Sequence, residues 1–210
     1  MKYLSTRDDS LKKSFNEILY QGLSKDGGLY LPVEWPTIDI KNLENKSYED
    51  VALEIIFPFV KENYSKSVLQ NILNESYANF RHKKRAPVKQ LETNKYILEL
   101  IYGPTYAFKD YALQFLGNLF SNSLFENPKK ITVLGATSGD TGSAAIHAFK
   151  TNQDINVFIL HPHKKVSPIQ QKQMTTVSES NIFNLAIDGN FDDCQKIVKE
   201  LFVDDDIQNK

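Results

Sequence analysis

Apolar positions in the first 85 residues recur mainly at helix spacing, separated by irregular polar stretches. Two sets with a spacing of four residues are Val51, Ile55 and Phe59, and Val68 and Ile72. Residues 25–32 contain two glycines and a proline, which mark a turn that leads into an extended segment. The pattern predicts a mostly helical N-terminal region over residues 1–85.

From residue 86 onward, short runs rich in β-forming residues alternate with helical runs. The expected strands are residues 96–101, 131–134, 156–160 and 182–187, and the expected helices are residues 107–120, 141–150, 168–175 and 191–202. Such alternation is typical of parallel strands joined by right-handed crossovers. We therefore predict an α/β region over residues 86–210, with a largely parallel sheet and helices on both faces. Its ligands should bind beyond the carboxyl ends of the strands.

Charge narrows the range of partners. The 25 Lys and Arg residues nearly cancel the 26 Asp and Glu residues, which argues against nucleic acid or a membrane surface as the main partner and favours a small molecule. The basic run over residues 81–85 is interpreted as a solvated helix end, where cations suit the helix dipole. The oligomeric state is left open.

The single cysteine, Cys194, excludes an internal disulfide and a cysteine-based zinc site, and its helix spacing among apolar residues predicts a core position. His161 and His163 lack a neighbouring carboxylate or cysteine, so we expect a surface loop there, and no metal site. The first residues lack the apolar run of a secretory signal, and no segment is long enough to span a membrane. These features predict a cytoplasmic protein.

One lysine, Lys109, lies in an unusual place. Residues 103–110 read Gly-Pro-Thr-Tyr-Ala-Phe-Lys-Asp and run from a strand through a turn into a helix. Lys109 shares the edge of the apolar face with Ala112, Leu116 and Phe120. The helix dipole and partial burial both disfavour an ammonium ion, which suits attack on an aldehyde cofactor. A lysine whose stem covers the edge of the core fits the same pattern.

A glycine-rich segment, residues 135–142, follows the strand expected at 131–134 and leads into a helix. Backbone N–H groups at such a junction can bind a carboxylate or phosphate, with the hydroxyls of Thr137, Ser138 and Thr141 as further donors. Its glycine spacing differs from that of dinucleotide-binding loops, P-loops and serine-hydrolase turns. A tight turn that serves only packing is the alternative. Asp140 is unexpected here, because a carboxylate repels an anion unless it is itself hydrogen-bonded.

Together these segments resemble threonine synthases, which are fold-type II enzymes dependent on pyridoxal 5'-phosphate. Residues 103–110 are similar to the family's tract around the cofactor-bound lysine, and residues 136–142 to its loop over the substrate carboxylate and cofactor ring. Residues 26–30, 165–170 and 189–195 agree with further family motifs, in order along the chain.

The resemblance implies an enzyme, a carbon-oxygen lyase that converts O-phospho-L-homoserine and water to L-threonine and phosphate. Lys109 would be the catalytic residue and bind the cofactor, with Phe108 and Asp140 also contacting it. The substrate carboxylate would be held by Thr137, Ser138, Gly139, Thr141 and Gly142. No metal is implied.

The resemblance is incomplete in length. Members of the family are about twice as long, and their second glycine-rich loop, which grips the cofactor phosphate, follows the position of Lys210. The acidic residues 203–210 would repel a phosphate. We therefore expect a fragment that lacks the rest of the catalytic domain. Two other interpretations stay open: another fold-type II lyase, such as a hydroxy-amino-acid dehydratase, and a truncated, non-catalytic homologue.

Overall fold

A computed structural model describes residues 1–10, 12–202, 204 and 207. The chain divides into two compact units, Met1–Ala78 and Asn79–Lys210. The boundary expected between residues 85 and 86 remains a prediction. The acidic tail expected over residues 203–210 lies mostly outside the described residues.

The first unit contains the predicted helices and a small sheet. Strand β1 (Tyr3–Ser5) pairs antiparallel with β2 (Tyr30–Pro32), the extended segment expected after the glycine turn. Helix α1 (Phe15–Ile18) and the 3-10 helix η1 (Ile40–Leu43) are short. The longer helices α2 (Tyr48–Val60) and α3 (Lys66–Tyr77) are capped by Ser47 and Ser65, whose hydroxyls accept backbone hydrogen bonds. Helix α3 buries Leu69, Ile72, Leu73 and Tyr77.

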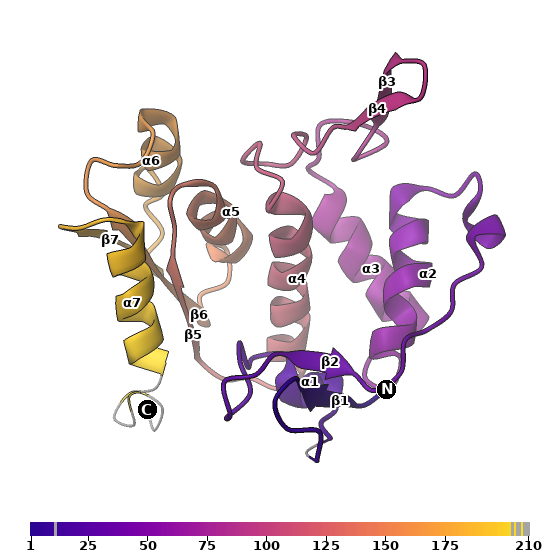
Figure 1. The fold of residues 1–210 in the computed structure, drawn as a ribbon, viewed down its shortest axis with the longest axis horizontal. Helices are drawn as coiled ribbons and strands as arrows, with labels where there is room; N and C mark the ends of the chain where they lie inside the picture. Colours follow the sequence, from indigo (N-terminus) through magenta and orange to yellow (C-terminus); the bar gives the residue numbers. More distant parts are fainter. Residues whose placement is uncertain (11, 203, 205–206, 208–210) are drawn as a thin grey trace. The chain divides into compact units, whose positions relative to one another are not determined.

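The second unit is built on a parallel sheet in the order β5-β6-β7 (Figure 1). Its strands are β5 (Ile131–Ala136), β6 (Ile155–Pro162) and β7 (Ile182–Ile187). The central strand is the most deeply buried, with Ile155 and Val157 fully enclosed. A strand covered on both faces needs this continuous run of apolar residues.

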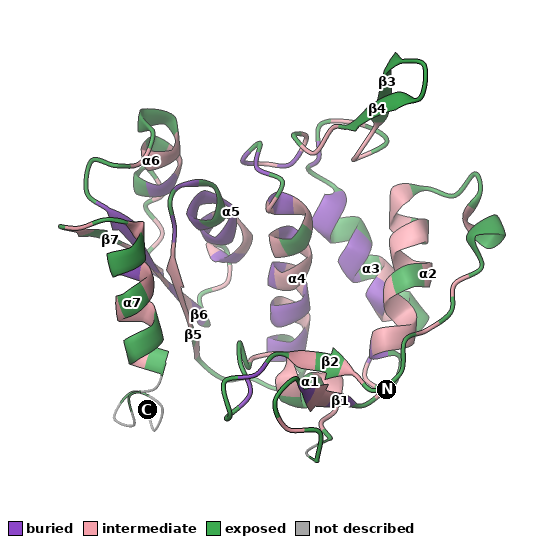
Figure 2. Ribbon diagram, viewed as in Figure 1, coloured by how far each residue is buried: buried purple, intermediate pink, exposed green. Residues whose placement is uncertain are grey.

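Helices cover both faces of this sheet (Figure 1). Helices α5 (Asp140–Phe149) and α6 (Pro168–Thr175) connect successive strands, so right-handed crossovers place both on one face. Helix α7 (Phe191–Phe202) contacts β5 and β6 from the other face and buries Cys194, as predicted. Helix α4 (Asp110–Glu126) packs against α5 through buried residues (Figure 2). The α/β fold inferred from the sequence is confirmed.

The strand expected over residues 96–101 is not part of the parallel sheet. Strands β3 (Val88–Glu92) and β4 (Lys95–Leu98) form an exposed antiparallel hairpin. Asn94, with φ of 62°, lies in the short connection between them and suits a tight hairpin turn. The apolar run resembled a buried strand, but its local turn decided the pairing.

In the described part of the chain, no helix combines the length and the apolar character needed to cross a membrane.

Candidate functional site

Lys109 is the residue immediately before helix α4, with helical backbone angles of −62° and −21°. The helix therefore starts three residues later than the expected residue 107, and Lys109 lies at its positive end. The amine is partly buried and lies 4.7 Å from the ring centroid of Phe108, whose side chain is 53% exposed. This contact with the aromatic ring defines where the amine lies.

The backbone that leads to Lys109 is fixed by its neighbour, Asp110. The Asp110 side chain is fully buried, and its two oxygens accept hydrogen bonds from the backbone N–H and the hydroxyl of Thr105, both at 2.8 Å. A Cβ at position 103 would lie 2.4 Å from the Asp110 carboxylate, so only Gly103 fits. Burial raises the pKa of Asp110, while the Thr105 hydrogen bonds and the charges of His147 and Arg81 oppose that rise.

Arg81 holds the segment before Lys109 in place through hydrogen bonds to its backbone. Its guanidinium donates hydrogen bonds to the backbone oxygens of Gly103 and Pro104, the latter at 2.8 Å, and stacks 3.8 Å from the ring centroid of Tyr106. The expectation of a solvated helix end over residues 81–85 is wrong, because α3 ends at Tyr77 and Arg81 binds carbonyl groups instead. Tyr106 has φ of 64°, a strained conformation that costs on the order of 1–3 kcal/mol.

In the glycine-rich loop, the buried side chain of Thr137 holds the backbone in place through hydrogen bonds. Its hydroxyl oxygen accepts hydrogen bonds from the N–H groups of Gly139 and Gly142, both at 2.9 Å, and its side chain is 2% exposed. Those two N–H groups therefore point at Thr137. The buried hydroxyl of Ser143, which the sequence did not single out, donates to the carbonyl oxygen of Gly139 at 3.2 Å. The loop is thus held from both sides.

Ser138, Asp140 and Thr141 are the exposed members of this loop. The hydroxyls of Ser138 and Thr141 and the start of α5 are accessible to a ligand, and the positive end of the helix dipole favours an anion there. Gly139 has φ of 148°, which a residue with a side chain rarely adopts. The accessible hydroxyl donors of the loop therefore lie at its tip, next to the start of α5.

The unexpected carboxylate, Asp140, has a partner. The side-chain amide of Gln170, on α6, donates a hydrogen bond to it. Residues 165–170 agreed with a family motif, but nothing in the sequence indicated that Gln170 contacts Asp140, because the two residues are 30 positions apart. The amide supplies the hydrogen bond that a carboxylate at this position would need if the loop binds an anion.

His161 is buried in strand β6, with 3% exposure, so the expected surface loop is wrong for this residue. The strand runs two residues further than the apolar pattern indicated and takes His161 with it. Its Nδ1 has no hydrogen-bond partner among the described residues, and the same holds for Nδ1 of His147 on α5. His163, just beyond the strand, is exposed. Within the described ranges, no three metal-binding side chains cluster.

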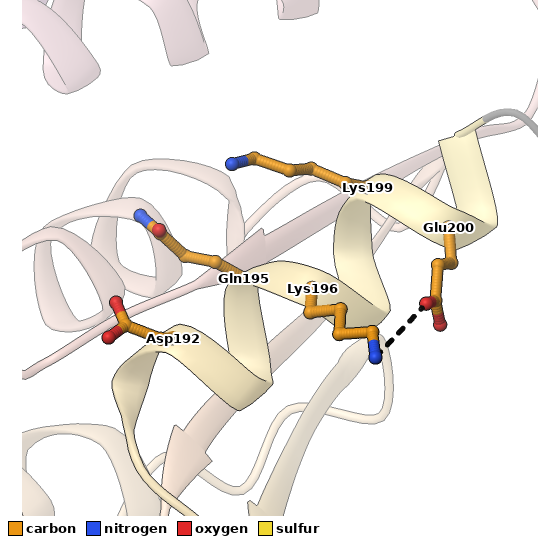
Figure 3. A pocket seen from close by; sticks show the side chains of 5 residues that line it. All are labelled: Asp192, Gln195, Lys196, Lys199 and Glu200. Atoms are coloured by element: carbon orange, nitrogen blue, oxygen red, sulfur yellow. Dashed lines mark ion pairs between the residues drawn. The ribbon is translucent and has the colours of Figure 1, made fainter.

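A shallow surface hollow of about 540 Å³ lies along helix α7. Its lining residues all come from that helix, and Lys196 and Glu200 form an ion pair at 3.9 Å (Figure 3). The lining side chains are Asp192, Gln195, Lys196, Lys199 and Glu200. None of the predicted site residues is among them, so this hollow is separate from the candidate site.

The comparisons with known proteins agree along the chain. Residues 2–77 match the family described as the threonine synthase N terminus. Threonine synthase from Pseudomonas aeruginosa is 43% identical over 207 residues, which cover 97% of this chain and 44% of that protein. The chain thus spans less than half the length of the curated relatives it matches.

Solved structures give the same result. The crystal structure of PLP-bound threonine synthase from Brucella melitensis has a TM-score of 0.90 and 44% identity, and the match covers 98% of this chain and 45% of that one. Yeast threonine synthase has a TM-score of 0.88 and 42% identity, with 98% and 44% covered. In sequence and in fold, therefore, the chain corresponds to the N-terminal portion of the threonine synthase family, which confirms the resemblance inferred from its motifs.

Proposed function

We propose that this chain carries the cofactor-binding lysine and the substrate-carboxylate loop of a cytoplasmic threonine synthase. The complete reaction would convert O-phospho-L-homoserine and water to L-threonine and phosphate. The observation that carries the proposal is the placement of Lys109. Its amine lies at a helix start, and the backbone before it is fixed by Asp110, Thr105 and Arg81.

The residues present fit pyridoxal 5'-phosphate. An aldehyde cofactor needs one amine in a defined position, and the ring of Phe108 beside Lys109 offers an aromatic surface at that position. When bound, the cofactor supplies an electron-withdrawing ring that stabilises negative charge on the substrate carbon. The protein supplies the remaining elements of the reaction.

Each element of the site has a proposed task. Lys109 binds the cofactor and later moves protons at Cα and Cβ of the substrate, since one flexible amine can reach both atoms. Ser138 and Thr141, at the start of α5, bind the substrate carboxylate with their hydroxyls. Thr137 keeps the backbone of the loop in the required shape. Asp140 faces the cofactor and is oriented by Gln170.

The test has a cofactor step and a substrate step. Pyridoxal phosphate is added to the wild-type chain, to Lys109→Ala and to a control, Lys89→Ala, whose exposed side chain lies on the hairpin. The visible absorbance of the protein-bound cofactor should develop in the wild type and the control and be absent from Lys109→Ala. Equal spectra in all three proteins would refute the role of Lys109.

The substrate step uses O-phospho-L-homoserine and product analysis. Release of phosphate together with L-threonine supports a threonine synthase. Formation of a 2-oxo acid and ammonia from a hydroxy amino acid would identify a dehydratase instead.

A further inference from the structure

Helix α6 touches both halves of the candidate site. Gln173 and Met174 follow Gln170 by three and four positions, so the three residues share one face of the helix. Gln170 and Met174 meet the glycine-rich loop, and Gln173 meets the lysine segment. No role for these three residues was predicted from the sequence.

The contact with the glycine-rich loop is close. The Gln170 side-chain oxygen accepts a hydrogen bond from the hydroxyl of Ser167 at 2.8 Å, which leaves its nitrogen to donate to Asp140. A Cβ on Gly139 would lie 2.3 Å from that side-chain oxygen, so a side chain at position 139 would displace the Gln170 amide from its present position. Met174, fully buried, approaches Gly142 in the same way, at 2.8 Å from the position a Cβ would take.

The contact with the lysine segment is a single directed hydrogen bond. The Gln173 nitrogen donates to the backbone oxygen of Thr105 at 3.1 Å, across 68 positions of sequence. Thr105 in turn donates its N–H and its hydroxyl to Asp110, the neighbour of Lys109. Gln173 is therefore two hydrogen bonds away from the residue that begins helix α4.

Helix α6 is itself fixed to the fold. Ser167 caps its first turn by accepting a hydrogen bond from the N–H of Gln170 at 3.3 Å. At the other end, the side chain of Asn184 on β7 donates to the carbonyl oxygen of Met174 at 3.0 Å. The helix can therefore act as a spacer of fixed position.

We propose that Gln170 and Gln173 are positioning residues that set the placement of Lys109 relative to the glycine-rich loop. The inference rests on the proposed function, since placement matters only if a cofactor on Lys109 and a substrate on the loop must meet. Small displacements of a reacting group slow catalysis strongly, and a shift of about 1 Å lowers the reaction rate by roughly 100-fold. An amide suits the task, because it donates to an acceptor and accepts from a donor at one tip.

The chemistry of the amide can be separated from its volume. A Gln-to-Glu change keeps the shape but replaces the donor with a carboxylate. At position 170 the new charge would face Asp140, and at position 173 it would face the oxygen of Thr105. Both contacts become repulsive. Protonation of the new carboxyl restores a donor, and an ordinary Glu has a pKa of about 4.3. The loss is therefore expected to reverse in acid.

The experiment measures how fast pyridoxal phosphate followed by borohydride labels Lys109 in the full chain, by peptide mapping. The variants are Gln170→Glu and Gln173→Glu, with Gln171→Glu on the same helix as the matched control. We expect labelling to slow about tenfold or more in the first two at pH 7.5 and to recover only in part, relative to the control, as the pH falls toward about 4.3. Wild-type labelling rates in both folded variants, or an equal loss in Gln171→Glu, would overturn the proposal.

Hydrogen exchange without cofactor separates this proposal from the proposed function. The Thr105 N–H should exchange faster in Gln173→Glu, and the Gly139 N–H faster in Gln170→Glu, each by about tenfold if its loop opens more readily by about 1.4 kcal/mol. If wild-type Lys109 is never labelled, the proposed function fails, while unchanged exchange in both variants overturns the positioning role. Where a Glu variant does not fold, Gln170→Met and Gln173→Met remove the donor without adding charge.

Discussion

Removing the Asp110 side chain should destabilise the second unit measurably. In Asp110→Ala, the N–H and the hydroxyl of Thr105 both lose their acceptors in a site where Asp110 is fully enclosed. An unpaired buried polar group costs about 1–3 kcal/mol, so the two together cost about 2–6 kcal/mol. Loss of a buried charge offsets part of this, because burial raises the pKa of Asp110. We expect a net loss of about 2–4 kcal/mol near neutral pH.

The matched control for this change is Asp110→Asn. Its amide oxygen can accept from the Thr105 N–H, and its nitrogen can donate to the Thr105 hydroxyl oxygen. We expect the free energy of unfolding to stay within about 1 kcal/mol of the wild type. Urea unfolding followed by circular dichroism measures both variants, provided that the slope of free energy against urea is unchanged. An equal loss in Asp110→Asn and Asp110→Ala would refute the hydrogen-bond account.

The pH dependence gives a second check on Asp110. Because its pKa in the folded state is raised above the ordinary 3.8, the stability it contributes is fully present below that value and is lost as pH rises through the folded-state pKa. The gap in stability between wild type and Asp110→Ala should therefore widen as pH falls from 7 toward 4. A gap that narrows over this range would contradict the assignment.

Three further changes test the surrounding structure. Thr137→Val should lower the free energy of unfolding in urea by about 2–6 kcal/mol, because two buried N–H groups lose their acceptor. Thr137→Ser keeps the hydroxyl and should cause a much smaller loss. Similar losses in the two variants would argue against the role of the Thr137 hydroxyl in holding the loop. Gly139→Ala should lower the thermal midpoint, since its Cβ would collide with Gln170 and its φ is unfavourable, and an unchanged midpoint would be inconsistent with the loop geometry. Burial lowers the pKa of His147 below its ordinary 6.5, so the stability contributed by the neutral ring is lost as pH falls below 6.5. His147→Gln should make this decline in stability less steep. An equally steep decline in the variant would contradict the role assigned to His147.

Local pattern predicted the sheet and its helices well. The bounds of β7, α6 and α7 match the expected ranges, and β5 and β6 differ from theirs by one or two residues at an end. In these elements apolar periodicity and cap residues agree, so local and tertiary preferences favour the same structure. The hairpin β3-β4 was misplaced, because periodicity alone does not say which partner a short apolar run will find.

The sequence motifs of the candidate site could be predicted, but the hydrogen bonds that hold those motifs in place could not. Lys109 and the glycine-rich loop are contiguous segments with recognisable residues, whereas their supports come from far away in sequence. Arg81 reaches residues 22 and 23 positions away, and Gln173 reaches Thr105 across 68 positions. Such contacts follow from tertiary packing and leave no periodic trace in a single sequence.

The central claim, that Lys109 is the cofactor-binding amine, is tested most directly by competition among the lysines of one protein. A limiting amount of pyridoxal phosphate is added to the wild-type chain, reduced with borohydride at successive times, and located by peptide mapping. The account predicts that the peptide containing Lys109 is labelled first and well ahead of exposed lysines such as Lys89. Labelling of Lys109 no faster than that of Lys89 would contradict it.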